Sequence, residues 1–187
     1  MTRAFGPQPI DRDVLGEIVE MASRAPSAGK TQGWHLVLLE GTDTERFWSA
    51  SLPADRREGF AWPQLLCAPV IAVVLSDPQA YLARYREDDK ASTGLGESTD
   101  RWPAPFWTID AAMAAMTILL AAEERGLGAL LFGVFHHESE VRRALQIPDS
   151  LEIVAAIALG HPLESPVGRS ASRRRRSPDE IIHWGRW

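Results

Sequence analysis

The strongest constraint on the fold comes from two uninterrupted apolar runs that are rich in β-branched residues. They are Val70–Leu75 and Ile153–Leu159. A run without polar alternation predicts a strand that is covered on both faces, so helices have to lie on each side of the sheet. Two further strands are predicted at Trp34–Leu39 and Ala129–Phe135. Four strands that alternate with helical segments indicate an α+β or α/β domain.

The segment Ile109–Arg125 gives the strongest helical signal. Its apolar residues continue around every side, which is typical of a helix in a core or between subunits. We expect Asp110 in the first turn, where a carboxylate favours the helix dipole, and Gly126 as a left-handed cap at the end. Shorter helices are predicted at Asp11–Ser23, Thr44–Leu52, Pro78–Tyr85 and His137–Leu145, with a helical turn at Trp62–Cys67 and a charged turn at Asp55–Glu58.

The size and charge of the chain exclude several classes of protein. A length of 187 residues suits a single domain, 1–187, and a net charge of -5 gives no global reason to expect nucleic-acid or membrane binding. The longest apolar run, Ala111–Ala122, is shorter than the ~18 residues of a membrane span. The N-terminal sequence contains no apolar segment of a signal peptide, so we expect a cytoplasmic protein.

The single cysteine, Cys67, directly precedes a predicted buried strand. A lone cysteine excludes a disulfide within the chain and suits a reducing cytosol. Because no histidine lies near it in sequence, a buried structural thiol is favoured over a catalytic one.

Two segments have the composition of ligand-binding backbone. In the sequence RAPSAGKTQGW, Pro26, Ser27 and Gly29 end a helix and open a turn of small residues, which lets the backbone approach a flat or anionic ligand. The predicted strand in GLGALLFGVF reaches Gly133, where amides are not obstructed by a side chain. The alternative for the second segment is a core strand with a glycine bulge.

The C-terminal segment combines arginines with tryptophans. Arg173–Arg176 is either a solvated basic tail, a weak nucleic-acid patch or a phosphate site. In an extended segment Arg174 and Arg176 would point the same way. The chain ends with IIHWGRW, and two tryptophans are costly to leave in water, so the tail should dock on its own domain or on a partner subunit.

Two other segments are candidates for functional sites, one as a loop that covers a site and one as a metal site. The polar stretch 86–105 contains Gly94 and Gly96 and is predicted to be a long loop or lid. The adjacent pair His136 and His137 does not predict a metal site, because neighbouring side chains point apart and no ligand cluster repeats the spacing.

Four segments, in this order, resemble the FMN-dependent nitroreductase family, and most closely its actinobacterial-type members. They are TRAF at Thr2–Phe5, RAPSAGKTQGW at Arg24–Trp34, the long stretch Ala111–Phe135, and SRRRRSPDEIIHWGRW at Ser172–Trp187; the strand Ile153–Pro162 also fits. The resemblance implies an α+β fold with a central, mostly antiparallel sheet flanked by helices. It also implies an intertwined homodimer with FMN at the interface and the extension 163–187 docked on the partner subunit.

The resemblance also assigns site residues. The flavin would lie along Pro26, Ser27 and Ala28, near Lys30, and the backbone amides at Phe132, Gly133 and Val134 would face its N5 edge. Arg174 and Arg176 would hold the phosphate, and Arg3 would stabilise the ribityl chain or the N1–O2 side. The lid with Trp102, Phe106 and Trp107 would shape the acceptor pocket. No catalytic side chain and no metal is implied.

The implied activity is hydride transfer from NAD(P)H through FMN to a nitroaromatic, quinone or similar acceptor in ping-pong order. Two departures from the family pattern bear on cofactor affinity. An arginine-rich segment that usually precedes the TRAF motif is not in this sequence, and Lys30 replaces a common asparagine. The alternatives are a flavin-binding or storage protein without turnover, a member that uses a deazaflavin, and a nucleic-acid-binding protein that uses Arg173–Arg176.

Overall fold

A four-stranded antiparallel sheet, in the order β1-β2-β4-β3, forms the centre of the protein. The strands are β1 (Trp34–Glu40), β2 (Val70–Ser76), β3 (Gly128–Phe132) and β4 (Glu152–Gly160). Every residue of β2 is buried between its neighbours β1 and β4, which confirms the strand covered on both faces. The computed structural model describes residues 1–164 and 168–187, and only the backbone of 169 and 170, so residues 165–167 of the predicted extension lie outside the described residues.

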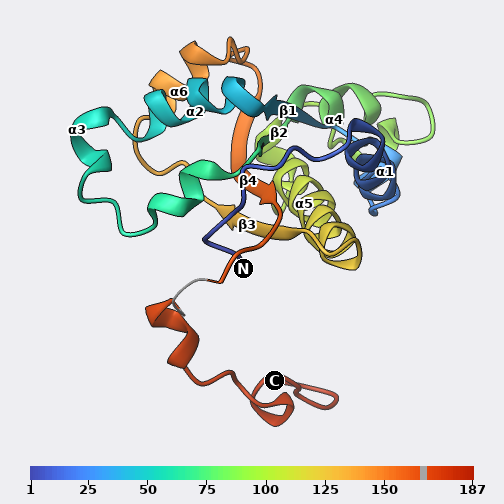
Figure 1. Ribbon diagram of the computed structural model, residues 1–187. Helices are drawn as coiled ribbons and strands as arrows, with labels where there is room; N and C mark the ends of the chain where they lie inside the picture. The colour runs from blue at the N-terminus through green and yellow to red at the C-terminus, as the bar shows by residue number, and fades with distance from the viewer. Residues whose placement is uncertain (165–167) are drawn as a thin grey trace.

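Two pairs of helices cover the two faces of the sheet. The even-numbered residues of β2 from 70 to 74 pack beneath α1 (Arg12–Ala22) and α5 (Phe106–Glu124). The odd-numbered residues from 71 to 75 pack beneath α2 (Thr44–Ser51) and α6 (Glu138–Ala144). Figure 1 shows these helix pairs on opposite sides of the sheet. The fold is therefore α+β with flanking helices, as the sequence predicted.

The central helix α5 differs from its prediction in one respect that matters for the site. It begins at Phe106, three residues before the predicted start, so Asp110 lies in the second turn and is buried rather than exposed at the helix end. Its small residues, five alanines among them, pack in the core, whereas Met113, Met116 and Leu120 remain exposed. Gly126 ends the helix with φ of 72°, as predicted.

Among the described residues, α5 alone has the length and apolarity of a membrane-spanning helix, although the sequence predicted no such span. The helix is longer than the apolar run identified in the sequence, because it also includes Phe106, Trp107 and Ile109 at its N-terminal end. One apolar face of α5 consists mainly of alanines and packs against the sheet and α1. The other apolar face carries the exposed methionine and leucine side chains.

The remaining helices, strands and turns lie close to their predicted positions, with small differences in their bounds. The charged turn is a single helical turn, α3 (Ala54–Arg57), and α4 (Pro78–Arg84) occupies the predicted helix after β2. β3 ends at Phe132, three residues earlier than expected. The segment 86–105 contains two short 3-10 turns and is tied down where Trp102 Nε1 donates to the Leu95 carbonyl at 2.9 Å.

The prediction that Cys67 is buried is wrong. Its side chain is exposed, because Cys67 ends the 3-10 turn Pro63–Cys67, in which Leu65 alone is buried. The C-terminal tail also does not dock on its own domain. Trp184 and Trp187 are 86% and 97% exposed, and Figure 1 shows the tail extending away from the body.

Candidate ligand-binding site

A cavity of about 580 Å³ opens at the end of β3, between that strand, α2 and the N-terminal segment. This volume is in the range of small-molecule binding sites. Four of the predicted site residues line it, namely Arg3, Phe132, Gly133 and Val134. The structure thus brings together the strand end and the N-terminal arginine, which are about 130 positions apart in the sequence.

One wall of the cavity is a rigid aromatic cluster. The rings of Trp48 and Phe132 are parallel, with 5.9 Å between centroids and 4° between planes. Phe47 meets Trp48 edge-on at 5.1 Å. Phe47 and Trp48 are buried and support this wall from behind, whereas Phe132, Phe60 and Trp62 are partly exposed and suit a flat, apolar ligand. Sequence reasoning missed this wall, although the dense run of aromatic residues between positions 47 and 62 was a visible signal.

Arg3 places a positive charge on the rim of the cavity. Its backbone is held because the neighbouring Thr2 N–H donates to the Ala129 carbonyl at 2.9 Å. The guanidinium lies 5.1 Å from the centroid of the Trp62 ring, a cation–π distance. No carboxylate of the described residues forms an ion pair with Arg3. An anionic or electron-rich group of a ligand could therefore bind there.

The strand end supplies unpaired amides. Pairing of β3 with β4 stops at Phe132, and within the described chain neither Gly133 nor Val134 donates its N–H to an acceptor. A Cβ at Gly133 would lie 2.4 Å from the ring of Phe135, which is itself 86% exposed. A side chain at position 133 would therefore displace the exposed Phe135 ring, and with glycine there the two amides have no acceptor among the described residues.

The predicted loop 26–33 lies elsewhere in the chain and does not line this cavity. Ala28 N–H donates to Asp110 Oδ2 at 2.7 Å, and the Gly29 carbonyl accepts from Arg84 Nε at 2.9 Å. These contacts place the loop on α4 and α5. In Figure 1 this region is on the right of the molecule, whereas α2 lies on the left. Pro26 and Lys30 are exposed on the same loop.

The predicted acceptor residues lie beside that loop. Trp102 and Trp107 are 8% and 7% exposed and pack with the buried Tyr81, and Phe106 is packed against them. Ala28 contacts the same cluster. These aromatics are therefore close to loop 26–33 and not to the cavity at the end of β3.

The two predicted phosphate ligands share one partner in the tail. Both carboxylate oxygens of Glu180 accept from Arg174, at 2.6 Å each, and Arg176 donates to the Glu180 carbonyl. The hydrogen bonds from Arg174 lower the pKa of Glu180 to about 2. Both arginines thus contact the same residue of the tail, and neither is among the residues that line the cavity.

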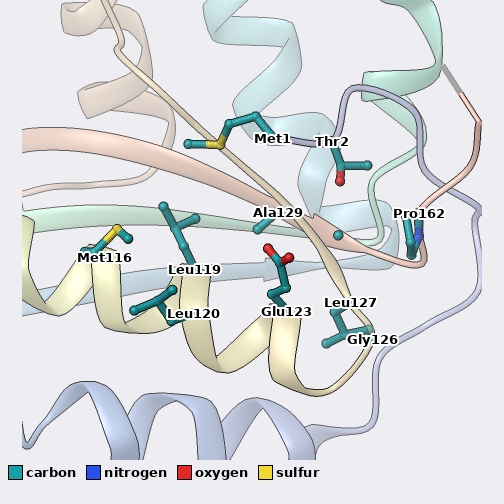
Figure 2. Close-up of a pocket in the computed structure, with 11 residues that line it drawn as sticks. Met1, Thr2, Met116, Leu119, Leu120, Glu123, Gly126, Leu127, Ala129 and Pro162 are labelled. Atoms are coloured by element: carbon teal, nitrogen blue, oxygen red, sulfur yellow. The ribbon is translucent and has the colours of Figure 1, made fainter. Parts of the chain in front are cut away.

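A second hollow lies on α5. This groove of about 480 Å³ runs between α5, the start of β3 and the N-terminus. Figure 2 shows Met116, Leu119 and Leu120 along one side, with Met1 and Thr2 opposite. Met116 and Leu120 are 52% and 59% exposed, so this groove continues into the exposed apolar face of α5.

Comparison with known proteins agrees with this architecture. The sequence model described as the Nitroreductase family matches residues 1–161. A protein of Thermus thermophilus named NADH dehydrogenase is 31% identical, over 87% of this chain and 82% of its own length. A Staphylococcus aureus protein named NADPH-dependent oxidoreductase is 25% identical, over 99% of this chain and 69% of its own length. The solved structure of an FMN-dependent nitroreductase from Clostridium difficile R20291 matches with a TM-score of 0.68 at 19% identity, covering 100% of this chain and 94% of that one.

Proposed function

This chain belongs to the nitroreductase family, and we propose that it uses FMN to pass hydride from NAD(P)H to an organic acceptor. It is an NAD(P)H-dependent oxidoreductase, in keeping with the family and with relatives named for NADH or NADPH. The finer proposal is that FMN is the cofactor and that a nitroaromatic or a quinone is the acceptor. The donor and the acceptor use the site in turn, in ping-pong order, and the protein acts in the cytoplasm.

The observation that carries the proposal is the cavity at the end of β3. It combines a flat aromatic wall with two amides and an arginine that, among the described residues, have no hydrogen-bond acceptor and no carboxylate partner respectively. These features fit a flavin, which has a planar ring, ring atoms that accept hydrogen bonds and an anionic reduced form. Bound FMN would supply the hydride chemistry, and the protein would position and tune it.

The chain's own residues then have distinct roles. The Gly133 and Val134 amides would donate to the ring edge and fix its orientation. The positive charge of Arg3 would favour the reduced, anionic ring electrostatically. Phe132 and Trp48 would exclude water from one face of the site. No side-chain acid or base is needed in this scheme.

Separation of the predicted site residues within one chain favours a homodimer. Loop 26–33, the cavity and the tail arginines form three groups. A second copy packed on the exposed α5 face and its groove would bring loop 26–33 of one subunit to the cavity of the other. The tail, with exposed Ile181, Trp184 and Trp187, would dock on the partner subunit, and Arg174 and Arg176 would bind the FMN phosphate.

Titration of the dialysed protein with FMN tests this proposal first. We expect saturable binding near one FMN per chain, followed by NAD(P)H oxidation when a quinone or nitroaromatic is added. Gly133→Val would place a side chain against Phe135 and weaken binding, whereas Ala144→Val, on the exposed surface of α6, would not. FMN binding without turnover would support the alternative of a storage protein. Absence of FMN binding would refute the FMN site, whether or not the protein binds a deazaflavin.

A further inference from the structure

A buried carboxylate lies beneath loop 26–33, outside the cavity. Asp110 of α5 is 3% exposed, and its Oδ2 accepts hydrogen bonds from Ala28 N–H and from the Tyr81 hydroxyl, both at 2.7 Å. No lysine or arginine of the described residues forms an ion pair with it. A buried charge is tolerated only where donors satisfy it, so these two hydrogen bonds are what stabilise the carboxylate.

The same carboxylate also holds Tyr81, whose ring lies beside the loop. Tyr81 is fully buried on α4, and its hydroxyl donates to Asp110 Oδ2. Within the loop, the Gln32 N–H donates to Ser27 Oγ at 2.7 Å. One end of the turn, at Ala28, is therefore bonded to this carboxylate, and the Tyr81 ring that the carboxylate holds lies against Gly33 at the other end.

The backbone of this loop needs such support. Gly29, Lys30 and Gln32 have φ values of 62°, 55° and 53°, in the left-handed region. That region is unfavourable for lysine and glutamine, so a free loop of this sequence would adopt other conformations. Fixed contacts from α4 and α5 therefore select the conformation that is observed.

We propose that Asp110 is a positioning residue that holds loop 26–33 in its FMN-binding conformation, directly through the Ala28 amide and indirectly by fixing Tyr81, whose ring lies against Gly33 of the loop. The inference rests on the proposed function, in which this loop completes the FMN site of a partner subunit. Asp110 would not contact FMN itself. It would act by preorganising the loop, which reduces the entropy lost on binding.

Three variants of the full-length protein test the proposal. Asp110→Ala removes the acceptor, Asp110→Asn keeps an oxygen acceptor without the charge, and Asp149→Asn is a control on the exposed surface. Amide hydrogen exchange of a peptide covering 24–34 is measured without FMN, and FMN affinity by flavin fluorescence. Because hydrogen bonds to charged groups contribute strongly, Asp110→Ala should speed exchange and raise the FMN Kd by about tenfold to hundredfold. Asp110→Asn should fall between Asp110→Ala and the control.

A positioning role makes a further prediction that a purely structural role does not. At saturating FMN, kcat of Asp110→Asn should stay within about twofold of the original protein, because the loop is then held by the ligand. Unchanged exchange and unchanged Kd in both Asp110 variants would overturn the proposal. If Asp110→Ala does not fold, Asp110→Asn alone decides. If the original protein binds no FMN, the proposed function fails, and exchange at 24–34 still shows whether Asp110 holds the loop.

Discussion

Replacement of Gly29 by alanine tests whether the turn geometry of loop 26–33 depends on glycine. Gly29 has φ of 62°, and a Cβ there would lie 2.9 Å from Cε2 of Tyr85. A non-glycine residue in the left-handed region costs about 1–2 kcal/mol. Pressing a methyl group against a packed ring costs about 1–3 kcal/mol more. We therefore expect Gly29→Ala to lower the free energy of unfolding by about 2–5 kcal/mol.

Gly41 offers a matched control. Its φ is 55°, and a Cβ there would meet nothing within 4 Å. Gly41→Ala should thus cost only the backbone part, about 1–2 kcal/mol. Urea unfolding followed by far-UV circular dichroism measures both variants, at one protein concentration because association changes apparent stability.

A double-mutant cycle separates the steric part. In a Tyr85→Ala background the ring is gone, so Gly29→Ala should become less costly by about 1–3 kcal/mol. The FMN Kd of Gly29→Ala should also rise, because the displaced turn belongs to the proposed site. Equal destabilisation of Gly29→Ala and Gly41→Ala, with no coupling to Tyr85, would refute the reasoning.

Three further predictions concern other regions. Burial and the hydrogen bond to Asp110 raise the pKa of Tyr81. The stability that the neutral hydroxyl contributes is therefore fully present below pH ~10 and is lost as the pH rises further. In an alkaline titration followed by tyrosinate absorbance, one tyrosine should ionise late, and Tyr81→Phe should remove that late component. Met116→Glu on the exposed α5 face should convert a dimer to a monomer in light scattering, whereas Ala144→Glu on α6 should not. The exposed Cys67 should react with a thiol reagent in the native protein, and reaction only after denaturation would show that its surface is covered.

Local signals in the sequence were sufficient for the individual elements. The apolar run of β2 predicted a strand buried on both faces because no residue in it tolerates solvent. Asp11 caps α1 by accepting from the Asp13 N–H at 2.9 Å, and Gly126 ends α5, because capping depends on side chains and φ preferences within one turn. Likewise, the proline, serine and glycine of loop 26–33 predicted a turn through their own backbone preferences.

Resemblance to the family supplied what those local signals could not. Local pattern marked Gly133 as a strand end without an obstructing side chain but did not mark Arg3, and only the order of motifs suggested that the two belong to one site. In the structure both line the cavity at the end of β3. Their roles toward FMN remain predictions.

The tertiary structure decided the relations between distant segments. The Asp110 carboxylate meets the Ala28 amide 82 positions away, a contact that no local pattern reveals and that changes Asp110 from an assumed helix-end charge to a buried acceptor. Packing likewise brought Trp48 against Phe132 to form the cavity wall and left Cys67 at the surface. Sequence determined where the chain turns and which stretches are apolar, because those properties act within a few residues. Which polar and aromatic groups meet was fixed only when the helices closed over both faces of the sheet.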